Sequence, residues 1–145
     1  MPLNPKLRIF LDSNVIFSGL YSSKGPSGII LERFIDGELV VVISQQVLEE
    51  VIRTLKEKLP EALSAFNRLL ISVPPEIVKN PLPGEVADWA QVIHPEDDAI
   101  LAAAVAAQPD YLTTGDNYFF EHTEIMEKSR LRIVTPAQFL CCLED

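Results

Sequence analysis

The sequence has few of the residues that mark several common classes of protein. Its two cysteines are adjacent, at positions 141 and 142, and neighbouring cysteines seldom form a disulfide because the geometry is strained. They also lack the spacing of a zinc or redox motif. The longest apolar run, at 99–107, is too short for a bilayer that needs about 20 residues, and the first residues, MPLNPK, contain no signal-peptide core. We therefore expect a cytoplasmic protein with no membrane contact.

Basic residues are also scarce, with 12 Lys and Arg against 21 Asp and Glu, for a net charge of −9. Long-range attraction to nucleic acid is not expected from such a charge. Nucleic acid is not thereby excluded as a substrate, because carboxylates gathered around metal ions add negative charge while creating a locally electrophilic site. The 145 residues are 48% apolar and 23% charged, which predicts a single globular domain over residues 1–145.

Short apolar runs alternate along the chain with stretches of helical periodicity. The runs predict strands at 7–11, 39–43, 111–114 and 131–134, with an edge strand near 71–73. The periodic stretches predict helices from about 26 to 36, at 45–59, 62–70 and 97–107, a loop or short helix at 118–127, and a closing helix after Pro136. Four prolines within 73–83 predict a surface connection there. This alternation predicts an α/β fold, a three-layer α/β/α sandwich around a mostly parallel sheet of about five strands.

Acidic residues gather where the predicted strands end, which is where ligand sites lie in such folds. Four segments supply them: Asp12 directly after the first strand, Glu49 and Glu50 in the helix capped by Ser44, Asp97 and Asp98 at the start of the alanine-rich helix, and Asp116 after the fourth strand. Each acid alone has an ordinary explanation as a helix cap, a turn residue or a solvated side chain. Together, however, several uncompensated carboxylates would repel one another unless a cation held them.

A site made only of oxygen ligands suits magnesium or manganese better than zinc. The two histidines, His94 and His122, do not have the spacing of a metal triad. The sequence also lacks a glycine-rich phosphate loop, a GxSxG motif and an HExxH motif. A divalent ion held by carboxylates at the edge of a sheet indicates phosphate chemistry, in which the metal activates water and stabilises the leaving oxygen.

Three segments of the sequence carry a family resemblance. They are RIFLDSNVIFSGL at 8–20, SQQVLEEVIRTL at 44–55 and EDDAILAAAVAAQPDYLTTGDNYF at 96–119. In this order they resemble the signature blocks of PIN-domain nucleases and cover nearly the whole chain. The most similar branch is that of the stand-alone prokaryotic PIN proteins described as toxins of toxin–antitoxin pairs.

The resemblance implies a PIN-like fold and a ribonuclease that uses Mg²⁺ or Mn²⁺ to hydrolyse RNA phosphodiester bonds. Carried over residue by residue, it implies a catalytic and metal-binding cluster of Asp12, Glu50, Asp97 and Asp116, with Asp98 as an additional metal ligand and Asn14 and Thr114 as supporting polar groups. Helical periodicity leaves the choice between Glu49 and Glu50 open, and the family pattern chooses Glu50. The implied partners are an RNA substrate, a small antitoxin protein and a second copy of the chain in a homodimer.

Few residues near the predicted site offer contacts to RNA. Arg53 and Lys56, on the same helix as Glu50, are candidates for phosphate contacts, although exposed basic residues are more often simply solvated. Four aromatic residues close to the predicted site are candidates for base stacking, although core packing is the more common role of an aromatic: Phe17, Tyr21, Tyr118 and Phe119.

Three other readings compete with a nuclease. A phosphatase of the haloacid-dehalogenase type also begins with a strand ending in aspartate and uses magnesium, but it needs a second acid where this chain has Asn14. A response-regulator receiver domain would need paired acids after the first strand and a lysine after the fifth, and the sequence has neither. A degenerate PIN module acting as a binding scaffold is disfavoured because all four acids are present.

Overall fold

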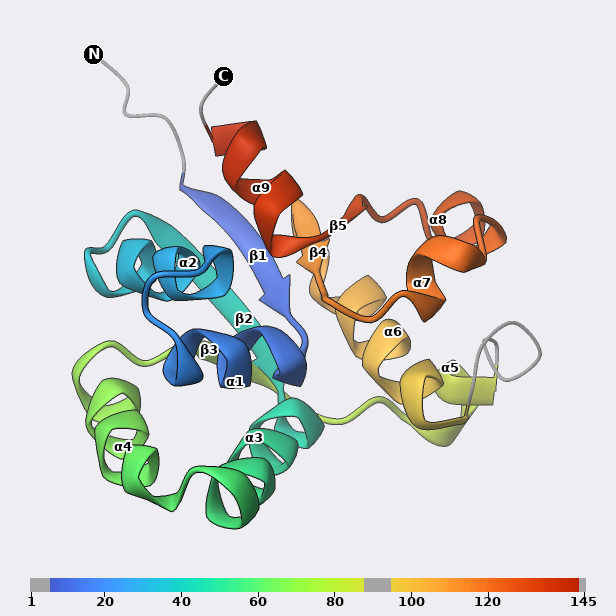
Figure 1. Ribbon diagram of the computed structural model, residues 1–145. Helices are drawn as coiled ribbons and strands as arrows, with labels where there is room; N and C mark the ends of the chain where they lie inside the picture. Colours follow the sequence, from blue (N-terminus) through green and yellow to red (C-terminus); the bar gives the residue numbers. More distant parts are fainter. Residues whose placement is uncertain (1–5, 88–94, 144–145) are drawn as a thin grey trace.

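A five-stranded parallel sheet forms the centre of the part of the protein that the computed structural model describes, residues 6–87 and 95–143, with the side chains of 95–97 not included. From edge to edge the strands are β3 (Glu76–Val78), β2 (Leu39–Ser44), β1 (Leu7–Leu11), β4 (Tyr111–Thr113) and β5 (Ile133–Val134). All four strand pairs are parallel, so the carboxyl ends of the strands lie at one edge of the sheet. In Figure 1 the β1 arrow points toward this edge.

Helices fill the connections between the strands. They are α1 (Ser13–Tyr21), α2 (Pro26–Ile35), α3 (Gln45–Lys58), α4 (Leu63–Ser72), α5 (Pro83–Ala87), α6 (Pro95–Ala107), α7 (Tyr118–Glu121), α8 (Glu124–Ser129) and α9 (Pro136–Leu143), with a 3₁₀ turn, η1 (Pro60–Ala62), before α4. Figure 1 shows α1 directly after β1, and α3 directly after β2. The first two helix–strand junctions therefore lie at the same edge of the sheet.

Helices cover both faces of the sheet. On one face, Leu11, Val41 and Ile43 line a small apolar cavity together with side chains of α1, α2 and α4. The neighbouring residue on β1, Phe10, is fully buried on the other face, where the side chain of Arg8 also reaches the end of α6. The expected three-layer α/β/α sandwich with a parallel sheet of five strands is confirmed.

Local signals in the sequence account for several helix ends. The hydroxyl of Ser44 accepts a hydrogen bond from the backbone N–H of Val47, which caps α3 as expected. Gly25 and Pro26 begin α2, and Gly37 follows that helix with a φ of +81°, a value that glycine adopts without strain.

Three parts of the fold differ from the expectation or add to it. The prediction of an edge strand near 71–73 is wrong, because Ile71 and Ser72 belong to α4. The edge strand, β3, comes after the two prolines, at 76–78. The helices α1 and α5 were not expected. The sequence signal for the α1 helix is weak, because the helix is short and contains Gly19. Its N-cap residue, Asp12, also directly follows the preceding strand, so that no separate helix start is visible. Where a loop or one short helix was expected, at 118–127, there are two helices, α7 and α8.

The closing helix α9 carries Cys141 and Cys142, and both are free thiols, as their adjacency predicts. This helix packs beside α2 and against β4 and β5. Within the described residues, every helix is too short or too polar to cross a membrane.

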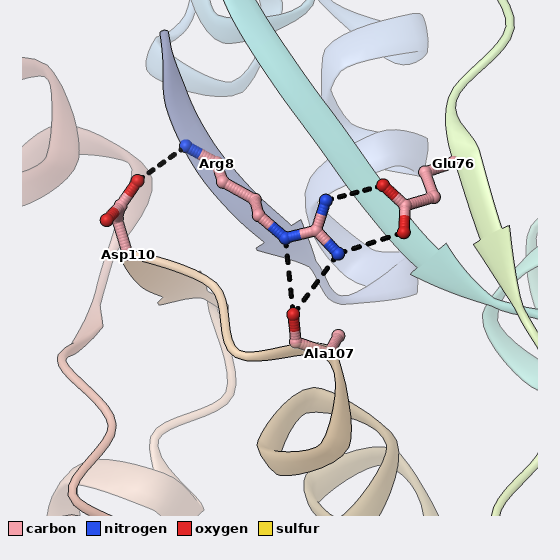
Figure 2. A network of polar contacts seen from close by, with 4 residues as sticks. All are labelled: Arg8, Glu76, Ala107 and Asp110. Atoms are coloured by element: carbon pink, nitrogen blue, oxygen red, sulfur yellow. Dashed lines mark hydrogen bonds and ion pairs between the residues drawn. The ribbon is translucent and has the colours of Figure 1, made fainter. Parts of the chain in front are cut away.

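Arg8 connects three elements away from the carboxyl edge (Figure 2). Its guanidinium donates two hydrogen bonds to the carboxylate of Glu76 on β3, and its Nε and Nη2 atoms both donate to the carbonyl of Ala107 at the end of α6, at 3.2 and 3.1 Å. Its backbone N–H donates to the side chain of Asp110 at 2.7 Å. The hydrogen bonds between the two side chains raise the pKa of Arg8 and lower the pKa of Glu76 from their ordinary values. Arg8 therefore fixes the edge strand and the end of α6 relative to β1.

We expect the Arg8→Met substitution to lower the free energy of unfolding by about 1–2 kcal/mol, because it also leaves the Ala107 carbonyl without its donors. Glu76→Gln should cost less than about 1 kcal/mol, since Glu76 is about half exposed and exposed ion pairs contribute little. Urea denaturation measures both, and Glu38→Gln, which breaks the exposed pair with Arg33, is the control. Equal losses in all three variants would contradict the connecting role of Arg8.

Candidate active site at the carboxyl edge of the sheet

Asp12 lies at the centre of the candidate site, where β1 ends and α1 begins. Its backbone N–H continues the sheet pairing by donating to the carbonyl of Thr113 at 3.0 Å, and its side chain is only 4% exposed. One carboxylate oxygen, Oδ1, accepts a hydrogen bond from the backbone N–H of Ser13 at 2.8 Å and so caps α1. The buried strand therefore places a carboxylate at the start of a helix, at the edge where parallel folds bind ligands.

Two polar side chains hold the other oxygen of Asp12. Oδ2 accepts hydrogen bonds from the hydroxyl of Thr114 at 2.9 Å and from the amide of Asn14 at 3.1 Å. Asn14 also accepts a bond from the backbone N–H of Gly115 at 2.8 Å. A Cβ at Gly115 would lie 3.3 Å from the Asn14 oxygen, so the close approach favours glycine. Asn14 and Thr114 thus lie beside Asp12, as expected for supporting groups.

Asp116 belongs to the same network through the turn after β4. Its backbone N–H donates to the Thr114 hydroxyl at 3.0 Å, and its Oδ1 atom accepts a bond from the backbone N–H of Tyr118 at 3.0 Å. The turn therefore holds the Asp116 carboxylate next to Thr114, within the surroundings of Asp12.

Glu50 reaches the site from α3 and is held by two residues that sequence reasoning missed. The hydroxyl of Ser13 donates to Glu50 Oε2 at 2.8 Å, and the side-chain amide of Gln46 donates to Oε1 at 3.2 Å. Gln46 precedes Glu50 by four residues, a spacing that places two side chains together on a helix and that could have indicated the contact. Glu49, by contrast, is exposed and lines a shallow groove on the outside of α3.

The electrostatics of the site centre on the pKa of Asp12. Burial raises this pKa above its ordinary value, and the negative charges of Glu50 and Asp116 raise it further. The hydrogen bonds from Thr114 and Ser13 act in the opposite direction but do not cancel the rise. The charge of Asp12 is therefore unfavourable as the site stands, and a cation beside it would relieve this cost.

For the two predicted acids of α6, Asp97 and Asp98, the structure gives fewer contacts. Asp98 is buried, at 5% exposed, and its side chain makes no hydrogen bond or ion pair with another described residue. The backbone of Asp97 lies in the first turn of α6, but its side chain is outside the described residues. Asp12, Glu50 and Asp116 thus lie near enough for the charges of the other two to act on Asp12, and the part that α6 plays remains a prediction.

The predicted RNA contacts lie on the outer side of α3. Arg53 and Lys56 are exposed and form no ion pair with any residue in the described ranges. They line the shallow groove with Ile52 and with two acids, Glu49 and Glu57, so the formal charges in the groove balance. This groove is not a strongly basic surface.

The chemistry of the donors fits a hard divalent cation, since Asp12, Glu50 and Asp116 offer only carboxylate oxygens. No lysine or arginine within the described residues forms an ion pair with any of them. As these side chains stand, no three acidic, histidine or cysteine side chains of the described residues are grouped closely enough to hold one ion. Glu50 is turned toward Ser13 and Gln46, and a bound ion would require it to exchange at least one of these bonds for a metal bond.

The chain is similar in fold to proteins of known structure. No curated protein is similar enough in sequence to match it. Its fold is similar to the crystal structure of VapBC2 from Rickettsia felis bound to a DNA fragment from their promoter, with a TM-score of 0.64 and 18% identity over 89% of this chain and 98% of that chain. It is also similar to FitAcB from Neisseria gonorrhoeae, with a TM-score of 0.61 and 17% identity over 88% of this chain and 97% of that chain. DNA-bound VapBC from Salmonella typhimurium is similar too, with a TM-score of 0.60 and 21% identity over 90% of this chain and 98% of that chain.

The match to a protein family includes the whole candidate site. The family model of the PIN domain matches residues 8–118, which span the site from Asp12 to Asp116. This range covers β1 from Arg8 onward, α3 and the turn after β4, the elements that carry or precede Asp12, Glu50 and Asp116. The chain belongs to the PIN-domain family.

Proposed function

We propose that this chain is a metal-dependent endoribonuclease, and that residues 1–145 form one PIN-like domain. The observation that carries the proposal is the buried carboxylate of Asp12, which bears the repulsion of Glu50 and Asp116 and has no basic partner within the described residues. Membership in the PIN-domain family supports it, because the sequence resembles the nucleases of that family. The sequence also contains no motif for a competing nucleophile or cofactor.

The residues proposed to hold Mg²⁺ or Mn²⁺ are Asp12, Glu50 and Asp116, joined from α6 by Asp97 and Asp98. A bound divalent ion would lower the pKa of a water molecule, so that it attacks phosphorus, and would stabilise the charge on the leaving oxygen. Oxygen ligands of this kind suit both metals.

Neighbouring residues would orient the carboxylates. Asn14 and Thr114 fix the plane of the Asp12 carboxylate through their bonds to Oδ2. Asp116 uses Oδ1 for the backbone of Tyr118, and its second oxygen has no bond to a described residue, so that oxygen is available to a ligand. Ser13 and Gln46 hold Glu50 on the side of α3 that faces Asp12. Arg53 and Lys56 are proposed as phosphate contacts further along α3.

We also propose a role in the cytoplasm as the toxin of a toxin–antitoxin pair, with a small antitoxin protein as its partner. The resemblance of the sequence to stand-alone prokaryotic PIN proteins supports this role. So does the similarity of the fold to VapBC2 and FitAcB. A homodimer is proposed on the family resemblance alone.

We expect Glu50→Gln to lower metal-dependent cleavage of a single-stranded RNA by at least about tenfold, or about 1.4 kcal/mol in the activation barrier. Glu49→Gln should stay within about twofold, because Glu49 is exposed on the other side of α3. The assay measures initial rates of cleavage in Mn²⁺ and in chelator with purified protein. The two variants are matched, since each removes one charge from adjacent positions of the same helix.

The same pair tests the toxin role in cells. Growth should stop on expression of the wild-type chain or the Glu49→Gln variant and continue with Glu50→Gln. If Glu49→Gln is the inactive variant, the assignment of the acid on α3 is wrong by one residue. Cleavage that is equal in wild type and both variants, or that persists in chelator, would contradict the proposed chemistry.

Metal and pH should act on stability through Asp12. The pKa of Asp12 is raised in the folded state, so its contribution to stability is present when it is protonated and is lost as the pH rises through the folded-state pKa. We therefore expect this carboxylate to destabilise the metal-free protein at pH 8 relative to pH 4, which is close to the ordinary aspartate pKa of about 3.9. Mn²⁺ at a hundredfold excess over its dissociation constant should add about 2.7 kcal/mol at pH 8, which raises the melting temperature by several degrees, and less at pH 4.

Thermal melts at both pH values, with Mn²⁺ and with chelator, measure this coupling. The Glu49→Gln variant is the control and should retain the full effect of Mn²⁺. If Mn²⁺ raises the melting temperature equally at pH 8 and pH 4, the ion binds without displacing a proton from Asp12. Intact folding with no metal binding would leave the chain as a PIN scaffold.

A further inference from the structure

Two aromatic side chains form an exposed stack on α1, the helix that begins at the candidate site. The rings of Phe17 and Tyr21 have centroids 6.3 Å apart and planes inclined by 23°. Phe17 packs partly against the hydrophobic core, whereas Tyr21 is 71% exposed. Phe17 therefore contacts both the core and the Tyr21 ring, whereas the Tyr21 ring is largely open to solvent.

The helix places this pair in line with the site. Asn14, whose amide contacts Asp12, and Tyr21 are seven residues apart, which at 3.6 residues per turn puts them roughly 20° apart around the helix axis and about 10.5 Å apart along it. Ser18, the exposed residue between them on this side, is small and leaves the path along the helix open. An exposed stripe therefore runs along α1 from the candidate metal site to the Tyr21 ring.

Core packing does not explain Tyr21, although it explains other aromatics near the site. Phe119 is fully buried, and Tyr118 stacks on His122 with ring centroids 4.2 Å apart. Of the four aromatics singled out in the sequence, Tyr21 alone appears among the exposed large hydrophobic residues of the described chain. Its ring therefore has a free face at the end of the stripe.

The α1 helix itself carries no charged side chain that would repel an anionic ligand beyond the acidic site. Within a chain of net charge −9, the sequence of α1, SNVIFSGLY, contains no charged residue. Lys24, three residues after Tyr21, is exposed and forms no ion pair within the described part of the chain. The groove on α3, by contrast, balances its two basic residues with two acids.

We propose that Tyr21, supported by Phe17, stacks on one base of a single-stranded RNA whose phosphodiester lies at the acidic site. This inference rests on the proposed ribonuclease function and adds to it the way in which the substrate is held. Stacking on an aromatic ring is a general means of binding single strands, and it suits a protein with few basic residues, because every base offers a π-face. Tyr21 is thus a binding residue, and the chemistry stays with the carboxylates.

The test compares Tyr21→Phe, Tyr21→Trp and Tyr21→Leu with the wild type. The probe is a short unstructured RNA with a fluorescent label, titrated in chelator so that binding is measured without cleavage. We expect Leu, which keeps apolar area but has no ring, to weaken binding about tenfold, equivalent to about 1.4 kcal/mol. Phe should stay within about twofold, and Trp should bind at least as tightly as the wild type. In Mn²⁺ the Leu variant should raise KM and leave kcat within about twofold.

A set of probes that each lack one base identifies the stacked nucleotide. Removing the base at one position should weaken the binding of RNA to the wild type. Removing the same base should weaken the binding to the Tyr21→Leu variant very little, because that variant has already lost the stacking contact. Ile71→Ala on α4, at a residue 81% exposed, is the control for removal of an exposed apolar side chain and should bind RNA as the wild type does. Thermal melts confirm that the variants are folded, as expected for exposed positions.

Failure of the inference differs from failure of the proposed function. If the wild type cleaves RNA and Tyr21→Leu has the same affinity and KM, the stacking role is overturned and the nuclease stands. Abasic penalties that are equal in wild type and Leu variant overturn it as well. If Tyr21→Leu binds RNA normally but loses a copurifying protein partner, the surface is a protein interface instead. A wild type that neither binds nor cleaves RNA in Mn²⁺ overturns the proposed function itself.

Discussion

The burial of the Asp12 carboxylate beside two other carboxylates is the constraint to which the rest of the site responds. Asp12 is 4% exposed, and both burial and the charges of Glu50 and Asp116 raise its pKa. Three donors, from Ser13, Asn14 and Thr114, make this burial tolerable without supplying a positive charge. A fold that needed only stability would be better served by an apolar residue at this position, because an unpaired buried carboxylate costs free energy. The cost is explained if the carboxylate serves a cation and its chemistry.

The parallel sheet is what makes this arrangement possible. Strands β1 and β4 are neighbours and end at the same edge, so Asp12 and Thr114 lie within hydrogen-bonding distance although they are 102 residues apart in sequence. The next strand, β2, leads into α3 and brings Glu50 to Ser13. Away from this edge, Arg8 ties β3 and the end of α6 to the central strand. The hydrogen bonds of Arg8, which connect the strands of the sheet, are thus separate from the hydrogen bonds around Asp12, where like charges lie near one another.

Much of this could be predicted from the sequence where the signals are local. The apolar run of β1 at 7–11 and the Ser44 cap of α3 have the predicted positions, and the carboxyl-edge rule places Asp12 and Asp116 together. The sequence predicts an edge strand near 71–73, whereas the strand lies at 76–78, because a short strand that pairs on one side leaves little pattern. Ser13 and Gln46 were missed because their role depends on the packing of α1 against α3. Periodicity does not distinguish Glu49 from Glu50, whereas in the structure only Glu50 of the two contacts Ser13.

The central claim, that the carboxylates around Asp12 hold a divalent cation, is tested most directly by anomalous diffraction from crystals of the protein grown with Mn²⁺. We expect a manganese peak roughly 2.0–2.5 Å from an oxygen of Asp12 and from an oxygen of Glu50 or Asp116, with the Glu50 side chain turned away from at least one of its present donors. A saturating concentration of Mn²⁺ that gives no peak beside Asp12, or a peak only elsewhere on the protein, would contradict the claim.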